Sequence, residues 1–412
     1  MYKPNKENSE INRSRWGALL LPGFRLYLFG LSFTYIGFWA QIVAQGWLVF
    51  RLTDSPLLLG VIMSTNTLPF LVFALPGGIF ADQFNKRTII LISRSLTIFL
   101  VTILVILTST NFLQVWHIFT IALLISSLDA IDIPARQSLI PELVPEHAIV
   151  SGISFATGLF HGGRIIGPAI AGVIISKIGE SGAFAIFAVA NLILIICLPF
   201  ITSINQPIKQ PKRWAIHKDI LEALNYIRSN KNTLSVSLLA VSAYFFIMTP
   251  MSLLPDFIRN VLMMDSIGLG NLATGQGVGA LIAGLLIAIS RNVKQKGRLV
   301  LFACFGLGIS LLLFSQTTNF IFAYISLVIF GFALGSFSTL TMSLLFELVP
   351  NSFHGRVMSL VVLCWGFTAF GNILTGFIAE QFSTPLSIAI AGTYMCICGI
   401  SAYIFLPSLK NI

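Results

Sequence analysis

Three charged residues lie close together in an otherwise apolar segment, 114–138. Asp129 and Asp132 are three residues apart, and Arg136 follows Asp132 by four. A helix would therefore place the two acids on one face and bring Asp132 within ion-pair reach of Arg136. An acid in such a place can take up and release a proton as a neighbouring cation moves, or it can form a fixed ion pair. The sequence leaves both interpretations open for each acid.

Three further ionisable residues interrupt apolar segments. Arg94 lies about 9 Å into its predicted helix, so that it can reach either the nearer surface or Asp129. Arg164 lies about 22 Å into the predicted helix 149–174. It could meet an anionic group of a bound molecule, respond to protonation of a nearby acid, or form an ion pair. His161, one turn earlier, could relay protons or form a hydrogen bond in the core.

The composition places most of the chain in a membrane. Of the 412 residues 56% are hydrophobic and only 10% are charged, whereas about a quarter are charged in ordinary soluble proteins. The net charge of +10 does not indicate a nucleic-acid partner, because the basic residues lie in short segments between apolar runs. All five cysteines fall within apolar runs, so we expect neither a disulfide nor a metal site. Residues 1–15 are polar and basic and lack the apolar region and cleavage site of a secretory signal, so we expect the first apolar run to stay in the mature protein.

Charged and turn-forming residues divide the chain into twelve apolar segments, each near the 20 residues that cross a bilayer. The expected spans are 25–50, 56–80, 88–108, 114–138, 149–174, 182–202, 232–255, 268–290, 299–315, 320–346, 356–380 and 386–406. The sequence therefore predicts an all-α integral membrane protein.

The distribution of basic residues predicts its orientation. Of the 25 lysines and arginines, Arg51, Lys177 and Arg259 fall on the outer side of this arrangement, and Arg94 and Arg164 fall within the membrane. The other 20 fall in segments that the positive-inside rule assigns to the cytoplasm. We therefore expect both termini in the cytoplasm and, for a bacterial protein, a location in the plasma (inner) membrane.

An internal repeat supports a division into two halves. Residues 138–145 (SLIPELVP) recur as 343–350 (SLLFELVP), displaced by 205 residues. Both copies join corresponding helices, which predicts two parallel six-helix bundles related by a pseudo-twofold axis along the membrane normal. The polar stretch between them could form an amphipathic helix on the membrane surface or a simple tether. The expected parts are the tail 1–24, the first bundle 25–202, the linker 203–231, the second bundle 232–406 and the tail 407–412.

The loop after the second segment resembles motif A of the major facilitator superfamily, G-x-x-x-D-R-x-G-R-R. Its matching residues, with asparagine in place of the second glycine, are Gly78, Asp82, Asn85, Lys86 and Arg87. Gln83 also departs from the pattern, whereas Asn85 is the substitute that best tolerates a left-handed backbone. The resemblance implies a cytoplasmic latch in which Asp82 lies near the helix that begins around Arg356. It also implies that Lys86 pairs with Asp132 or Asp129, with Arg136 completing the latch.

The fifth segment resembles antiporter motif C of the same superfamily, in which small residues let helices touch and proline bends the helix. The matching residues are Gly163, Gly167, Pro168 and Gly172, with Ala171 where the family has glycine. Together with Phe24-Arg25-Leu26 and 132–137 (DIPARQ), these residues resemble the branch that contains enterobactin exporters and macrolide efflux pumps.

In this superfamily the first, fourth, seventh and tenth helices line a central cavity. Besides Asp129, the resemblance assigns to it Tyr35, Gln41, Gln45, Tyr244, Phe245, Ser338, Thr339 and Thr341. Aromatic rings with scattered hydroxyls and amides suit an amphipathic solute, although helix packing alone could explain each residue.

We therefore expect a secondary transporter that exports a small amphipathic molecule, such as a siderophore or a macrolide drug, by proton antiport with alternating access. Uptake by proton symport, and a receptor or assembly protein that transports nothing, are the alternatives. The sequence contains no nucleotide-binding loop and no recognisable catalytic arrangement, so we expect no enzyme activity and no cofactor. The expected partners are the substrate, protons and lipid, and the protein is expected to be a monomer.

Overall fold

The computed structural model describes residues 17–204, 222, 225–290, 295–349 and 354–406, except for the side chains of Leu75, Asp82 and 354–363. Residues 216–221, 223 and 224 of the expected amphipathic linker helix lie outside the described residues, whereas 222 and 225–229 are helical. Pro350 at the end of the repeat also lies outside the described residues. The long helices of the first half are α2 (Pro22–Thr53), α3 (Pro56–Thr65), α4 (Leu68–Gln83), α5 (Lys86–Ser109), α6 (Val115–Leu143), α7 (Ile149–Ile178) and α8 (Glu180–Cys197). Those of the second half are α10 (Lys231–Phe246), α11 (Thr249–Asp256), α12 (Ser266–Ile289), α13 (Lys296–Ser315), α14 (Phe320–Leu348), α15 (His354–Gln381) and α16 (Thr384–Phe405).

Short helical turns accompany these helices. They are the 3-10 helices η1 (Gly17–Leu20), η2 (Glu146–Ala148) and η3 (Leu198–Phe200), and the π-helix η4 (Phe257–Val261). In the described part of the chain, eleven helical segments are long and apolar enough to cross a membrane. The 28-residue α15 completes the twelve spans that the sequence predicts.

Two of the predicted spans are broken helices. The second span divides into α3 and α4 around Asn66, and the seventh divides into α10 and α11 around Ile247. Each following helix has a proline, Pro69 or Pro250, in its first turn. Proline has no backbone N–H and fixes its own φ, so it starts a new helix more readily than it continues one.

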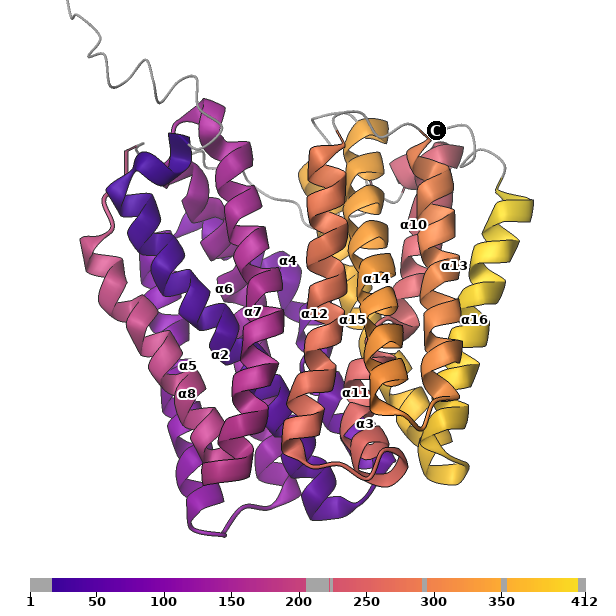
Figure 1. Ribbon diagram of the computed structural model, residues 1–412. Coiled ribbons are helices and arrows are strands. Elements are labelled where there is room, and N and C mark those ends of the chain that lie inside the picture. Colours follow the sequence, from indigo (N-terminus) through magenta and orange to yellow (C-terminus); the bar gives the residue numbers. More distant parts are fainter. Residues whose placement is uncertain (1–16, 205–221, 223–224, 291–294, 350–353, 407–412) are drawn as a thin grey trace, which may run out of the picture.

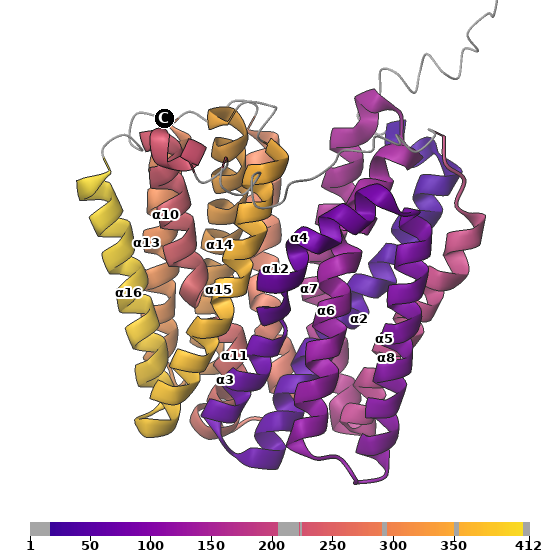
Figure 2. The ribbon, with the colours of Figure 1, turned by 180° about the vertical axis from the view of Figure 1, so that it is seen from behind.

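The helices form two bundles that lie side by side, one from each half of the sequence (Figures 1 and 2). In the first bundle α2 packs against α7 and α8, while α6 packs against α4 and α5. In the second bundle α14 packs against α12 and α13, while α16 packs against α13 and α15. The main contacts between the bundles join α7 to α12 and α3 to α15. We call this boundary the seam.

The two ends of the bundles differ in how the halves meet. We call the end of the bundles at which α2 begins and α8 ends the linker end, and we call the opposite end the far end. At the far end Arg259 Nη1 lies 2.7 Å from Asp54 Oδ1, and Ser55 Oγ donates a hydrogen bond of 2.9 Å to Glu380 Oε2. Ser266 Oγ of α12 also donates a hydrogen bond of 3.2 Å across the seam, to the Gly172 carbonyl oxygen of α7. The halves lean apart toward the linker end (Figure 1).

Candidate functional site

Four charged residues meet inside the first bundle, and we call them the charge cluster: Arg94 from α5, and Asp129, Asp132 and Arg136 from α6. Arg94 Nη2 lies 2.6 Å from Asp129 Oδ1 and also pairs with Asp132. Arg136 pairs with Asp132 one turn away on the same helix. Of the two possibilities that the sequence left for Arg94, the structure has the contact with Asp129. Two cations and two anions make the charge cluster neutral.

The charge cluster is buried, although its hydrogen bonding is incomplete. The side chain of Arg94 is 1% exposed and that of Asp132 is 0% exposed. Arg94 Nη1 donates a hydrogen bond of 3.1 Å to Asn191 Oδ1 of α8. Arg94 Nε, Asp132 Oδ1 and Arg136 Nη1 have no hydrogen-bond partner among the described residues. Each buried polar atom without a hydrogen-bond partner lowers the stability of the fold by about 1–3 kcal/mol, and by more when the group is charged. We therefore expect that the cluster serves function rather than stability.

The expected pairing of Lys86 with Asp132 or Asp129 is wrong. Lys86 begins α5 at the linker end, where its Nζ pairs with Glu142 near the end of α6. Asp132 lies ten residues before Glu142, about 15 Å deeper in the membrane, and Arg94 occupies the position beside it. Arg87 Nη2 meanwhile donates a hydrogen bond of 2.6 Å to Ser203 Oγ.

The rest of the motif A loop also differs from expectation. Asn85 has φ −63°, so its tolerance of a left-handed backbone is not used. Its side chain instead caps α5 by accepting a hydrogen bond of 3.0 Å from the Arg87 N–H. The Cβ position of Gly78 has no atom within 4 Å. The expected contact of Asp82 with the start of α15 lies outside the described side chains.

Arg164 lies at the seam, where its hydrogen-bond partner is an amide. Its Nη2 donates a hydrogen bond of 2.5 Å to Gln276 Oε1 of α12, across the seam. Its guanidinium stands 4.8 Å from the ring centroid of Trp39 on α2. Among the described residues no carboxylate lies within ion-pair distance of Arg164, so the ion-pair interpretation is wrong for this part of the chain. His161 packs its ring 5.7 Å from that of Phe160.

The motif C glycines make two kinds of close helix contact. A Cβ at Gly163 would lie 2.9 Å from Tyr35, and one at Gly167 would lie 2.6 Å from the Ile36 carbonyl oxygen, so these two glycines bring α7 onto α2. A Cβ at Gly172 would lie 2.6 Å from the Ser266 carbonyl oxygen, across the seam. Small residues thus let α7 touch both its own bundle and the other one.

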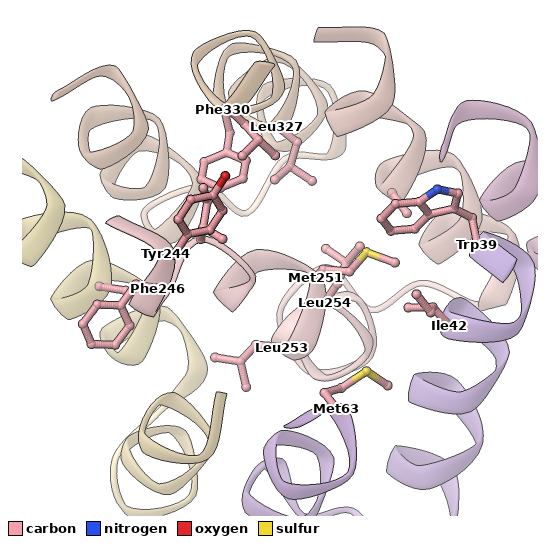
Figure 3. Packing of buried hydrophobic residues seen from close by; sticks show 14 of the residues in the cluster. Trp39, Ile42, Met63, Tyr244, Phe246, Met251, Leu253, Leu254, Leu327 and Phe330 are labelled. Carbon is pink, nitrogen blue, oxygen red and sulfur yellow. The ribbon is translucent and has the colours of Figure 1, made fainter. Parts of the chain in front are cut away.

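Apolar side chains from both bundles fill the seam beyond Arg164, toward the far end. Figure 3 shows Ile42 and Met63 of the first bundle facing Met251 and Leu254 of the second. All four are at most 9% exposed. The seam between Arg164 and the far end is therefore filled with apolar side chains.

The residues expected to line the cavity have several environments. Gln41 and Gln45 are buried and hydrogen-bond to each other at 2.7 Å, whereas Thr339 is exposed and Ser338 half-buried. The Thr341 hydroxyl is buried without a partner among the described residues. The aromatic members pack on other rings: Tyr35 on Phe160, Tyr244 on Phe337 and Phe245 on Phe246.

A cavity of about 470 Å³ lies between α2 and α7 in the linker-end half of the first bundle. None of the expected cavity residues lines it. Its walls are Leu19, Arg25, Leu28, Phe29, Ser32, Ser154, Phe155, Gly158 and Leu159.

Sequence reasoning missed three polar residues of these sites. Asn191 binds Arg94, Gln276 binds Arg164, and Asp256 is a buried acid at the far end. Asp256 accepts hydrogen bonds from Thr384 and, at 2.6 Å, from Asn260. Asn191 and Gln276 are polar residues within predicted spans, and this signal could have identified both, whereas Asp256 lies just beyond the predicted span 232–255.

Two six-helix bundles, the first holding a buried charge cluster, that meet along a glycine-lined seam define a transporter of the major facilitator superfamily. The transmembrane secretion effector family matches residues 13–411, and the chain belongs to this family.

Comparisons with individual proteins agree with this assignment. The staphyloferrin A transporter of Staphylococcus aureus is 25% identical over 89% of this chain and 92% of its own length. Macrolide efflux protein A of Streptococcus pyogenes is 24% identical over 86% of this chain and 89% of its own length. The crystal structure of a POT family transporter in complex with 5-aminolevulinic acid has the same fold. It has a TM-score of 0.78 and 13% identity, and the match covers 95% of this chain and 97% of that one.

Proposed function

We propose that this protein exports a small amphipathic molecule from the cytoplasm of a bacterium in exchange for protons. The observation that carries the proposal is the unequal pairing of the two acids in the charge cluster. Asp132 pairs with both Arg94 and Arg136, whereas Asp129 pairs with Arg94 alone.

This inequality favours Asp129 as the proton carrier. When Asp129 is protonated, Arg94 keeps an ionised partner in Asp132, so no buried cation is left unpaired. Protonation of Asp132 would leave Arg136 without an acid. The charge cluster therefore tolerates the loss of one negative charge at Asp129 at a much lower cost than at Asp132.

The seam supports alternating access. Gly172 approaches Gly270 and Arg164 approaches Gly277, so α7 and α12 run antiparallel in a fixed register. Continuing this register toward the linker end places Gly158 opposite Gly284, and neither has any atom within 4 Å of its Cβ position. These glycines can meet when the bundles 25–202 and 232–406 rock about the far-end contacts.

Crosslinking tests the rocking motion. In a background without the five native cysteines, Gly158→Cys with Gly284→Cys should crosslink only when the linker end closes. Ser55→Cys with Glu380→Cys reports closure of the far end, where the native side chains lie 2.9 Å apart. Substrate or a proton gradient should shift the two crosslinks in opposite directions. A parallel change of both would contradict alternating access.

The basic residues support an orientation with the linker end in the cytoplasm. The described conformation, with its contacts at the far end, is then the one that receives substrate from the cytoplasm. The relative named for macrolide efflux supports export as the direction, and the two relatives named for staphyloferrin A and for macrolides support a siderophore or a drug as the substrate.

Everted vesicles, whose cytoplasmic face is outward, test the function directly. With an acidic interior, wild-type protein should accumulate a radiolabelled macrolide or staphyloferrin A. Asp129→Asn should abolish the pH-driven accumulation because the side chain no longer carries a proton. Asp265→Asn is the matched control, since Asp265 caps α12 outside the charge cluster and asparagine caps a helix equally well.

The vesicles also separate the alternatives. A proton symporter would lose preloaded solute under the same gradient instead of accumulating it. A protein that transports nothing would give no flux in either direction. Full accumulation by Asp129→Asn would refute the assigned proton carrier while leaving export itself in place.

A further inference from the structure

The strongest unexplained feature of the described residues is the buried cation at the seam. Arg164 is 5% exposed, and no acid among the described residues pairs with it. The four members of the charge cluster, by contrast, neutralise one another. A buried charge is normally balanced by an ion of opposite sign. A bound anion would balance Arg164.

The surroundings of Arg164 offer further hydrogen-bond donors. Trp39 Nε1 and Gln276 Nε2 are both buried and have no hydrogen-bond partner among the described residues. Trp39 stands beneath the guanidinium at 4.8 Å, and the Gln276 amide already touches it through Oε1. Three donor groups from α2, α7 and α12 therefore gather at one place, and only one hydrogen bond joins them.

We propose that Arg164, Trp39 and Gln276 bind a carboxylate group of the exported molecule. A carboxylate brings the missing negative charge and two planar oxygens, each able to accept more than one hydrogen bond. A cationic group would be repelled by Arg164, and a neutral carbonyl would leave its charge unbalanced. The inference rests on the proposed export function and specifies the substrate class as amphipathic carboxylates.

The linker-end side of this site suits the apolar part of such a molecule. The Phe160 ring lies 5.2 Å from that of Tyr35 and 5.4 Å from that of Trp39, forming an aromatic surface next to Arg164. Gly158 and Gly162, on the same stretch of α7, have no atom within 4 Å of their Cβ positions. Gly158 also lines the cavity of about 470 Å³ that extends toward the linker end.

Carboxylate binding would also act on the seam. The hydrogen bond from Arg164 to Gln276 crosses between the bundles at 2.5 Å. A carboxylate competes with Gln276 Oε1 for the same guanidinium and, being charged, is the stronger acceptor. The bound substrate would therefore replace the hydrogen bond between the bundles with hydrogen bonds to its own carboxylate. Occupancy of the site by substrate would then be linked to the rocking of the bundles.

Binding to purified protein in lipid nanodiscs tests the site without transport. The probes are phenoxyacetate, 2-naphthoxyacetate and indole-3-acetate, each compared with its uncharged amide by equilibrium dialysis. We expect at least one carboxylate to bind about tenfold more tightly than its amide, as a charge-assisted hydrogen bond predicts. If no carboxylate binds more tightly than its amide, the proposal fails.

Substitutions test which residues cause the preference for a carboxylate over its amide. Arg164→Gln should remove it, and Trp39→Phe, which keeps a ring but loses the N–H, should reduce it. Arg51→Gln is the matched control, because Arg51 pairs with Glu180 at the far end. An unchanged preference in Arg164→Gln protein that elutes as a monodisperse peak would overturn the site. If Arg164→Gln fails to fold, an unchanged carboxylate preference in Trp39→Phe would overturn the site instead.

The two proposals fail in different ways. If the vesicles accumulate solute while no carboxylate preference exists, the carboxylate site is wrong and export stands. If the preference exists and depends on Arg164 while no solute moves, export is wrong and the binding site stands.

Discussion

The two bundles share an architecture but differ in what they bury. The repeat displacement of 205 residues places Leu334, Phe337 and Thr341 of the second bundle at the positions of Asp129, Asp132 and Arg136. These three residues are 6%, 0% and 3% exposed, so the second bundle fills with uncharged side chains the place where the first holds the charge cluster. The fold therefore does not require buried charge at this position.

At the linker end, by contrast, both bundles contain the same kind of ion pair. Lys86 pairs with Glu142 in the first bundle, and Lys296 pairs with Glu347 in the second. The two glutamates are equivalent in the repeat. An interaction that occurs in both bundles serves what they share, namely the fold, whereas one that occurs in a single bundle is a candidate for function.

The largest expected effect follows from breaking the charge cluster at its centre. Asp132→Ala leaves Arg94 and Arg136 without their shared acid, and removal of one partner from a buried pair costs about 3–5 kcal/mol. At the equivalent position of the second bundle, Phe337→Leu should cost less, about 1–2 kcal/mol, because it removes some buried volume but leaves no charge without a partner. Thermal unfolding in detergent measures both. Equal losses would show that the two positions are both merely structural.

A smaller loss is expected at Asn191, which corresponds to Cys396 in the repeat. Asn191→Leu deprives Arg94 of a hydrogen bond inside the bundle, and a bond to a charged group is worth about 1.5–3 kcal/mol. Cys396→Ala removes no partner of a charge and should cost about 1 kcal/mol. The same unfolding assay compares them, and a greater loss for Cys396→Ala would contradict the special role of Arg94.

Converting the first bundle to the uncharged pattern of the second should separate function from stability. The variant Arg94→Met, Asp129→Leu, Asp132→Leu, Arg136→Met removes all four charges of the cluster together, so none of them is left without its partner. Its stability should stay within about 2 kcal/mol of wild type, because apolar replacement of a whole buried ion-pair network is often neutral. Proton-driven accumulation in everted vesicles should be lost. Retained accumulation would assign the charge cluster to folding alone.

The smallest effects are expected at the repeated ion pairs. Lys86→Met should cost about 1 kcal/mol, since both partners are less than one-fifth exposed. Lys296→Met should cost no more than about 0.5 kcal/mol, because Glu347 is half exposed and water screens the pair. Unfolding at low and high salt measures the difference. A larger loss for Lys296→Met would mean that the two bundles are less equivalent than the repeat implies.

Much of the fold could be predicted from local pattern. Apolar length predicted the spans, and the displaced SLIPELVP copy predicted two related bundles. The breaks within the second and seventh spans were not predicted, although Pro69 and Pro250 mark them. The site was predicted only in part: the spacing of Asp132 and Arg136 gave their pairing, but the choice of Glu142 for Lys86 depends on relative depth in two different helices.

The sequence by itself determined that the chain is a membrane protein of twelve helices and that a few charges are buried in it. These properties follow from hydropathy and chain length, which act locally along the sequence. Only the tertiary structure decided which charges neutralise one another and that Arg164 meets Gln276 and Trp39 but no acid among the described residues. Such pairing depends on the packing of helices that are distant in sequence, because an ion pair forms only where two side chains reach the same depth on facing surfaces.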